Sequence, residues 1–359
     1  MRFDRRAPGG GAELLCRLEN GKALLEWTFH LEEESPSGEG AVLVRLEDSR
    51  GESVLESVQD LAEEEPLQAF LLQPRLWTGL GNPYLYHMEA LLLDGDGVCR
   101  DRIAGPLPLR SISRAGNRGE TGILLNGVSF GMRAVRYFLP RERSGAAWQC
   151  RVLEDFRLLG RLGANCLCLE KGDGAEGARG AFLQLCDRFG FLVCLGSLDS
   201  ASDQFRGQGR GLEKVLVHGS SLETALPWGK IPCLRPKAGE AQEPALLLPS
   251  DSSPTGLYYR YMAAWSREPF VYIDPRSLKR LRAGTYEVAV YSSCSRVALY
   301  SDGLIHEFQR GEGKFVFRDF SARGPCIMLN AEGDGCSHSL AVHKSLGDGP
   351  GAYGMGIKN

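Results

Sequence analysis

The segment 151–170 reads RVLEDFRLLGRLGANCLCLE and joins a helical pattern to a strand pattern. Apolar residues recur at helical spacing from Val152 to Leu162 and stop at Gly163, which is typical of a helix that ends at a glycine. The continuous apolar run Cys166–Leu169 follows, and such a run is typical of a strand buried on both faces. The segment therefore predicts a helix that leads into a strand of a parallel sheet.

The same pattern continues on both sides of this segment. A second helical pattern runs from Phe182 to Phe189, stops at Gly190 and leads into the apolar run Phe191–Leu195. The run Ser129–Val135 precedes the first helix and predicts another strand. The resulting β-α-β-α-β order indicates a parallel α/β sheet in the middle of the chain.

Both flanking regions have the pattern of antiparallel β-structure. Short apolar runs alternate with turn clusters from Glu13 to Ile112 and again from Tyr258 onward, and the 45 glycines among 359 residues mark many of these turns. We therefore predict a multidomain chain of β and α/β structure. Its parts are an immunoglobulin-like β-sandwich over residues 1–115, an α/β domain over 116–254, a second immunoglobulin-like sandwich over 255–346 and a flexible tail over 347–359.

Composition and charge exclude several classes of protein. The net charge is −3 and the basic residues form no long run, which argues against a nucleic-acid partner. No stretch approaches the ~20 consecutive apolar residues of a membrane helix, and the start Met1–Arg6 lacks the apolar core of a signal peptide. We therefore expect a cytoplasmic protein with no membrane partner.

The cysteines indicate neither disulfides nor a standard metal site. There are 11 of them, an odd number, and most lie in apolar runs, so they are expected to act as small buried hydrophobic residues. The chain has no Cys-x-x-Cys pair, and the spacing of Cys336, His338 and His343 matches no standard zinc site. We therefore expect no metal and no cofactor.

Four groups of motifs along the chain resemble one enzyme family. They are Pro74–Trp77 with Asn82–Tyr86; Leu125–Gly127 with Arg133–Val135; Asp155–Leu159 with Gly163–Asn165 and Leu185–Gly190; and Tyr258–Phe270 with Val290–Cys294 and Asp302–Gly303. In this order they are similar to glycoside hydrolase family 2, the β-galactosidase and β-glucuronidase family. The resemblance implies the end of an immunoglobulin-like domain, the entry and first two helices of a (β/α)8 barrel, and the sandwich that follows the barrel.

The sequence also departs from the family's pattern. The Asn-Arg-His end of the barrel-entry motif is replaced by Arg136-Tyr137-Phe138, and Cys168–Gly172 stands where the family has sugar-lining residues. The Asn-Glu dipeptide that carries the family's acid/base glutamate occurs nowhere in the chain. The segment from Asn126 to Asp251 is only about half of the ~250 residues that a complete (β/α)8 barrel takes. We therefore expect a truncated barrel remnant.

These observations predict a degenerate family-2-like protein, a pseudoenzyme that acts in carbohydrate binding or subunit assembly, as a homo-oligomer or with a partner subunit. The alternative is an active β-glycosidase with a rearranged or partner-completed site. Its candidate catalytic carboxylates are Glu170 and Asp199, near the ends of predicted strands. Arg136 and Tyr137 are candidate ligand-binding residues, since the resemblance places ligand-facing residues directly after the first barrel strand. The other carboxylates near these strand ends are Asp173, Glu176 and Asp203.

Overall fold

The structure is a computed structural model of the chain. It describes residues 1–5, 11–32, 39–115, 122–140, 145–170, 176–196, 215–216, 222–223, 231–236, 246–249, 253–281 and 284–344. The chain forms two compact units, Met1–Phe156 with Asn165–Ile231 and Arg157–Ala164 with Pro232–Asn359. None of the described helices is long and apolar enough to cross a bilayer. The predicted flexible tail lies outside the described residues.

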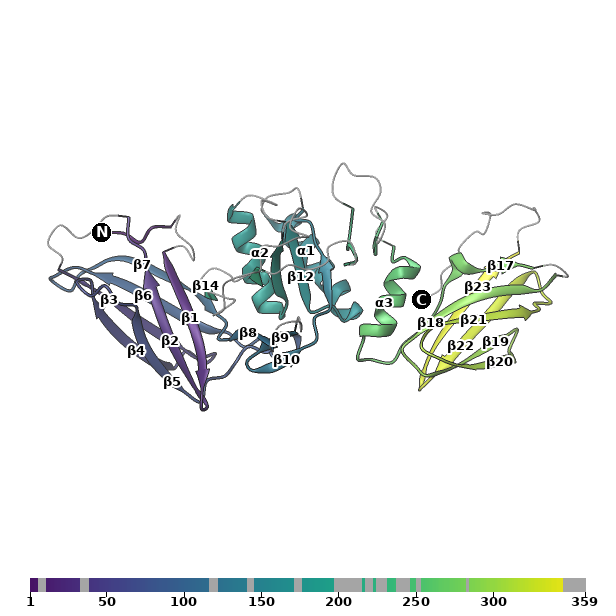
Figure 1. The fold of residues 1–359 in the computed structure, drawn as a ribbon. Coiled ribbons are helices and arrows are strands. Elements are labelled where there is room, and N and C mark those ends of the chain that lie inside the picture. The colour runs from purple at the N-terminus through teal and green to yellow at the C-terminus, as the bar shows by residue number, and fades with distance from the viewer. Residues whose placement is uncertain are drawn as a thin grey trace, which may run out of the picture. The chain divides into compact units, whose positions relative to one another are not determined.

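Two four-stranded antiparallel sheets of the first unit share one hydrophobic core (Figure 1). One sheet has the order β14 (Val215–Leu216), β1 (Ala12–Glu19), β2 (Lys22–Phe29), β5 (Leu67–Leu72), and the other β4 (Ser53–Asp60), β3 (Ala41–Glu47), β6 (Tyr86–Leu93), β7 (Cys99–Leu107). Trp27 from the first sheet and Met88 from the second are fully buried in this core. Buried and partly exposed residues alternate along β3, as expected of a strand with one face on the core.

A short antiparallel sheet follows, with the order β10 (Val128–Phe130), β9 (Gly122–Leu125), β8 (Ile112–Ala115). The β9–β10 hairpin turns at Asn126 and Gly127, whose φ angles of 54° and 77° suit this dipeptide. The Asn126 side chain donates to the carbonyl of Trp77 at 2.9 Å and accepts from the amide of Ser111 at 2.9 Å. The Leu-Asn-Gly motif therefore forms a hairpin that is tied to the preceding chain.

The predicted parallel sheet is confirmed. Its order is β11 (Ala134–Arg136), β12 (Cys166–Glu170), β13 (Leu192–Gly196) and β15 (Leu222–Glu223), and every neighbouring pair is parallel. The helices α1 (Ala146–Leu162) and α2 (Glu176–Phe189) connect the first three strands (Figure 1). Phe156 of α1 and Phe182 of α2 meet edge to face at 5.6 Å between ring centroids.

The strand predicted over Ser129–Val135 is instead two short strands, β10 and β11, with residues 131–133 between them. Asn165 holds this break in place. Its side-chain oxygen accepts from the amide of Arg133 at 2.7 Å, and its side-chain nitrogen donates to the carbonyl of Gly131 at 2.9 Å. These bonds replace ladder bonds that a continuous strand would make, which a local pattern of apolar residues does not reveal.

A buried ion pair, together with Trp77, joins α2 to the segments that precede β6 and follow β7. Arg110 and Asp187 are 1% and 3% exposed, and Arg110 Nη1 lies 2.8 Å from Asp187 Oδ1. The guanidinium carbon of Arg110 lies 4.3 Å from the ring centroid of Trp77, whose Nε1 donates to the Asp187 carbonyl at 2.7 Å. Gly190 is needed here as well, because a Cβ atom on it would lie 2.6 Å from the carbonyl carbon of Gly79, in the 3-10 turn η2 (Gly79–Gly81).

The second unit contains α3 (Gly256–Trp265) and two further sheets around one core. Thr255 caps α3, since its hydroxyl accepts from the amide of Tyr258 at 3.3 Å. One sheet has the order β16 (Val271–Ile273), β18 (Tyr286–Ser292), β17 (Lys279–Arg280), with β21 (Gly313–Phe320) also paired to β18 and the 3-10 turn η4 (Pro275–Ser277) before β17. The other has the order β20 (Leu304–Arg310), β19 (Arg296–Ser301), β22 (Cys326–Gly333), β23 (Cys336–His343).

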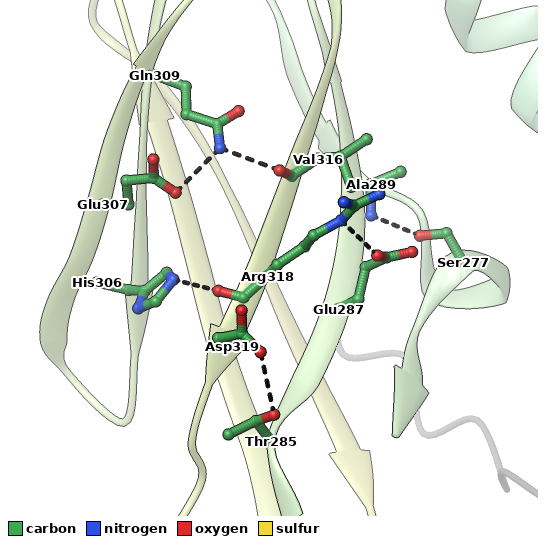
Figure 2. Close-up of polar contacts among 10 residues, drawn as sticks. All are labelled: Ser277, Thr285, Glu287, Ala289, His306, Glu307, Gln309, Val316, Arg318 and Asp319. Carbon is green, nitrogen blue, oxygen red and sulfur yellow. Dashed lines mark hydrogen bonds and ion pairs between the residues drawn. The ribbon is translucent and has the colours of Figure 1, made fainter. Parts of the chain in front are cut away.

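Side chains of β20 bridge these two sheets (Figure 2). His306 Nε2 donates to the carbonyl of Arg318 at 2.8 Å, and Gln309 Nε2 donates to the carbonyl of Val316 at 3.0 Å. Both acceptors belong to β21, so these bonds hold one sheet against the other at this side of the core.

The structure confirms the prediction of a β-rich chain with a small parallel sheet. The predicted domain boundaries remain a prediction.

Replacing Asp187 with Asn should lower the free energy of unfolding by about 3–5 kcal/mol, because the Arg110 charge would stay buried without its counter-charge. Urea unfolding followed by circular dichroism measures the change. The matched control is Glu287→Gln, which removes the partner of Arg318 in an exposed pair at 2.7 Å and should cost less than about 1 kcal/mol. Equal effects of the two substitutions would contradict a structural role for the buried pair.

Candidate functional site

The carboxyl ends of three parallel strands meet at one edge of the sheet. Arg136 of β11 lies opposite Cys168 of β12, which lies opposite Cys194 of β13. Alternate residues of a strand point to opposite faces, so these three side chains lie on one face and their neighbours on the other. This edge is where ligands bind in parallel α/β sheets and where the sequence places its candidate residues.

Tyr137 belongs to the hydrophobic layer between the sheet and the helices. It is 2% exposed, and its ring stacks on Phe182 of α2 at 5.0 Å between centroids. Its hydroxyl donates to Asp155 Oδ2 at 3.1 Å, and its amide donates to the Cys168 carbonyl at 2.9 Å. The described contacts of this candidate ligand-binding residue are therefore those of a core tyrosine.

Arg136 lies on the opposite face and is 7% exposed. It stands next to Cys168, and its positive charge is one of the influences that lower the pKa of that thiol, after the hydrogen bonds from Cys166 and Cys194. A buried guanidinium beside polarisable thiols is a cationic group with little access to water. Among the sequence-predicted residues, Arg136 is the one that the described structure places beside other reactive groups.

The candidate carboxylates are not brought together by the described structure. Glu170 ends β12 opposite Gly196 of β13, and its side chain lies outside the described residues. Glu176 begins α2, and its side chain also lies outside them. Asp173, Asp199 and Asp203 lie wholly outside the described residues. A catalytic role for Glu170 or Asp199 stays a prediction.

Three cysteine thiols converge on the face of the sheet that carries Arg136. The Sγ atoms of Cys166, Cys168 and Cys194 all lie within 4.8 Å of one another, and those of Cys166 and Cys194 are 3.2 Å apart. Each of the three residues is at most 1% exposed. The pKa of Cys166 is raised well above its usual range, first by the hydrogen bond with Cys168 and then by the bond with Cys194 and by burial. The three thiols therefore form one buried, mutually contacting group.

A second candidate site is a groove of about 440 Å³ on the outer face of the sheet β20-β19-β22-β23. Two aromatic rings, Tyr300 and Phe308, line it together with Arg296 and Glu332. Phe308 is 50% exposed, and the Arg296 guanidinium carbon lies 4.6 Å from the centre of its ring. The groove therefore offers a flat apolar surface bordered by charges of both signs.

Two polar residues beside the groove, Asn330 and Ser339, hold Glu332 in place. Asn330 Nδ2 donates to Glu332 Oε1 at 2.6 Å, and Ser339 Oγ donates to Asn330 Oδ1 at 3.0 Å. Partial desolvation raises the pKa of Tyr300, and the negative charge of Glu332 and a hydrogen bond with it raise it further. Tyr300 is thus a neutral donor, Glu332 an acceptor and Arg296 a donor around one aromatic ring.

Sequence patterns did not identify this groove. Tyr300 and Glu332 lie on neighbouring strands of one sheet, but 31 positions separate them along the chain, and only strand pairing brings them together. The alternation of exposed residues in β19 and β22 could have placed both on a solvent-facing surface. It could not have indicated that they are diagonal neighbours, with Tyr300 opposite Asn330 and Glu332 opposite Ala298.

Comparisons with known proteins identify the fold. No protein-family model and no curated protein matches the sequence. Among solved structures, an FMN-binding beta-glucuronidase from Facaelibacterium prausnitzii L2-6 matches with a TM-score of 0.65 and 15% identity, over 96% of this chain and 75% of its own. A Bacteroides uniformis beta-glucuronidase matches with a TM-score of 0.65 and 14% identity, over 95% of this chain. A putative beta-galactosidase from Bacteroides fragilis matches with a TM-score of 0.64 and 15% identity, over 95% of this chain.

These likenesses confirm the structural part of the predicted resemblance. The chain is similar in fold to beta-glucuronidases and a beta-galactosidase over nearly its whole described course. It spans 74% of the length of the Bacteroides fragilis structure and 62% of the Bacteroides uniformis one. Identities near 15% show a shared fold and carry no activity from those proteins to this one.

Replacing Tyr137 with Phe should lower the free energy of unfolding by about 1–3 kcal/mol, because the buried Asp155 carboxylate would lose a hydrogen bond. Chemical unfolding measures the effect. Tyr84→Phe is the control, since the Tyr84 hydroxyl accepts an exposed hydrogen bond from the Ser49 amide and its loss should cost less. An unchanged stability of Tyr137→Phe combined with weaker ligand binding would show instead that Tyr137 contacts a ligand.

Proposed function

We propose that the protein is a non-catalytic relative of glycoside hydrolase family 2 that binds carbohydrate. The observation that carries the proposal is the groove formed by Tyr300, Phe308, Arg296 and Glu332 on the second unit. A sugar ring has an apolar face of C–H groups and a rim of hydroxyls. Exposed aromatic rings pack against the C–H face, while carboxylate, amide and guanidinium groups bind the hydroxyls. The groove supplies both kinds of contact within one surface.

The parallel sheet supports the non-catalytic part of the proposal. In a (β/α)8 barrel the catalytic groups stand at the carboxyl ends of several strands. Four parallel strands are present in the described part of this chain, and the described residue that follows the first of them, Tyr137, is occupied by core contacts. The face of these strands that points away from α1 and α2 packs against Trp77 and Ile231.

Carbohydrate binding is tested on a glycan array that carries neutral and uronic-acid oligosaccharides, followed by calorimetric titration with the best binder. We expect Phe308→Ala to weaken binding about 10-fold or more, because the loss of one aromatic contact worth ~1.4 kcal/mol changes an equilibrium by a factor of ten. Glu332→Gln should weaken binding as well. Met328→Ala is the matched control, since Met328 is 51% exposed on the same sheet but does not line the groove.

Two outcomes would overturn the proposal. One is the absence of binding to any glycan on the array by a folded protein. The other is turnover of an aryl β-galactoside or β-glucuronide that is lost in Glu170→Gln, which would establish the alternative, an active β-glycosidase that uses the carboxyl end of β12. Equal effects of Phe308→Ala and Met328→Ala would place the sugar elsewhere on the protein.

One observation favours a second function, self-assembly. Phe70 and Leu72 of β5 are 61% and 64% exposed, and β5 ends its sheet in the described part of the chain. Exposed apolar side chains on a strand at a sheet edge are typical of a surface that pairs with another chain. Burial of this surface in a dimer would stabilise it by ~25 cal/mol per Å² of apolar area.

We expect light scattering to detect an oligomer at micromolar concentration and to detect mainly monomer for the double variant Phe70→Lys, Leu72→Lys. The control is Val128→Lys, because Val128 is 70% exposed on the separate strand β10. A wild-type protein that is a monodisperse monomer would rule out self-assembly through β5. That result would leave the carbohydrate experiment unaffected.

A further inference from the structure

Two neighbouring strands direct three thiols to one point. Cys166 and Cys168 are two positions apart on β12, so their side chains lie on the same face of the sheet. Cys194 of β13 lies directly opposite Cys168. The three sulfur atoms are thus presented by two central strands, with no loop involved, and all lie within 4.8 Å of one another.

Sulfur atoms at these separations fit the coordination sphere of a metal ion. A metal–sulfur distance of about 2.3 Å places the ligands of a three-coordinate centre about 4 Å apart. The Cys166 and Cys194 sulfurs, now at 3.2 Å, would need to separate by less than about 1 Å, which a change of side-chain torsion can supply. The strands would keep their register.

The donor set selects the type of ion. All three donors are soft thiolates, and in the described residues no histidine or carboxylate belongs to the group. Zn²⁺ takes four ligands in structural sites, whereas Cu(I) is a soft ion suited to thiolates. Hard ions such as Mg²⁺ and Ca²⁺ require oxygen ligands and are excluded.

We propose that Cys166, Cys168 and Cys194 form a buried three-thiolate site for Cu(I). Binding forms three Cu–S bonds and releases the three thiol protons to solvent, with no change in oxidation state. The complex carries a net negative charge, and the nearly buried Arg136, which lies opposite Cys168, offsets part of it. The metal would link β12 to β13 and stabilise the sheet.

The surroundings of the cluster determine how the ion enters. The thiols pack with Trp77, Ile123, Leu125 and Ile231 in one hydrophobic cluster, and each of the three cysteines is at most 1% exposed. Loading should therefore be rapid while the chain folds and slow once the sheet has formed. This kinetic difference separates the cluster from cysteines at the surface.

The experiment uses the full chain with Cys99, Cys150, Cys326 and Cys336 replaced by Ser, because these four thiols are exposed or partly exposed. The protein is refolded anaerobically under reducing conditions with one equivalent of Cu(I) supplied from a soluble chelator. Copper per chain is measured after gel filtration, and X-ray absorption identifies the coordinating atoms. We expect one copper per chain with three sulfur neighbours and no nitrogen or oxygen neighbour.

Two single variants then locate the site. Cys168→Ala should weaken Cu(I) retention in a chelator competition by at least about 10-fold. Loss of a residue that only hydrogen-bonds to a metal ligand already lowers metal affinity by about 10-fold or more, and loss of a ligand should cost at least as much. Cys186→Ala should retain copper fully, although Cys186 is equally buried, because it lies on α2 and outside the cluster. Circular dichroism without metal shows that each variant folds, and Cys166→Ala replaces Cys168→Ala if the latter does not.

The proposal is overturned if the refolded protein retains no copper or if the bound copper has nitrogen or oxygen neighbours. It is also overturned if Cys168→Ala and Cys186→Ala retain copper equally. The X-ray absorption result is obtained on the protein with all three thiols, so it stands even if every alanine variant unfolds. No outcome depends on carbohydrate binding.

Discussion

The buried contact among Arg110, Asp187 and Trp77 fixes the first unit of the chain. A guanidinium that is 1% exposed requires a counter-charge and a full set of hydrogen-bond acceptors, and Asp187 meets it at 2.8 Å. Trp77 adds a cation–π contact and donates to the Asp187 backbone. Asp187 belongs to α2, so its contacts with Arg110 and Trp77 hold α2 against the segments that contain these two residues. Gly79 and Gly190 approach each other closely at the same place.

The parallel sheet has two faces of different chemical character. The face toward α1 and α2 has Tyr137 at its edge, and the Tyr137 ring stacks on Phe182 of α2. The other face carries Arg136 and three thiols beneath a cover of apolar side chains. The pKa shifts of Cys166 and Cys168 run in opposite directions because hydrogen bonds among thiols favour one thiolate at the expense of another. In the described part of the chain both faces are packed, and the groove for which we propose carbohydrate binding belongs to the second unit.

The fold of this protein does not by itself assign its function. Its backbone is similar to those of beta-glucuronidases, yet the described residues do not assemble a pair of carboxylates at the strand ends. The groove in which we propose that a sugar binds lies on the outer face of a sheet in the second unit, where Phe308 and Glu332 come from β20 and β22. Such a surface needs only exposed residues on paired strands, so it can arise without a complete barrel.

The sequence by itself determined most of the elements and their type. One prediction was wrong: the β-pattern expected from Tyr258 onward begins instead with the helix α3, Gly256–Trp265. Apolar runs with periods near 3.6 and 2 predicted the two helices, the parallel strands and the flanking antiparallel sheets, because burial of one face leaves a local pattern. One predicted strand is two strands in the structure, and between them the Asn165 side chain accepts from the Arg133 amide and donates to the Gly131 carbonyl. Side-chain bonds to the backbone leave no such local pattern in the sequence. Only tertiary structure decided that Cys194 lies beside Cys166 and that Glu332 lies beside Tyr300. Strand pairing joins residues that are far apart in the chain, and the register of that pairing is set by packing of the whole sheet.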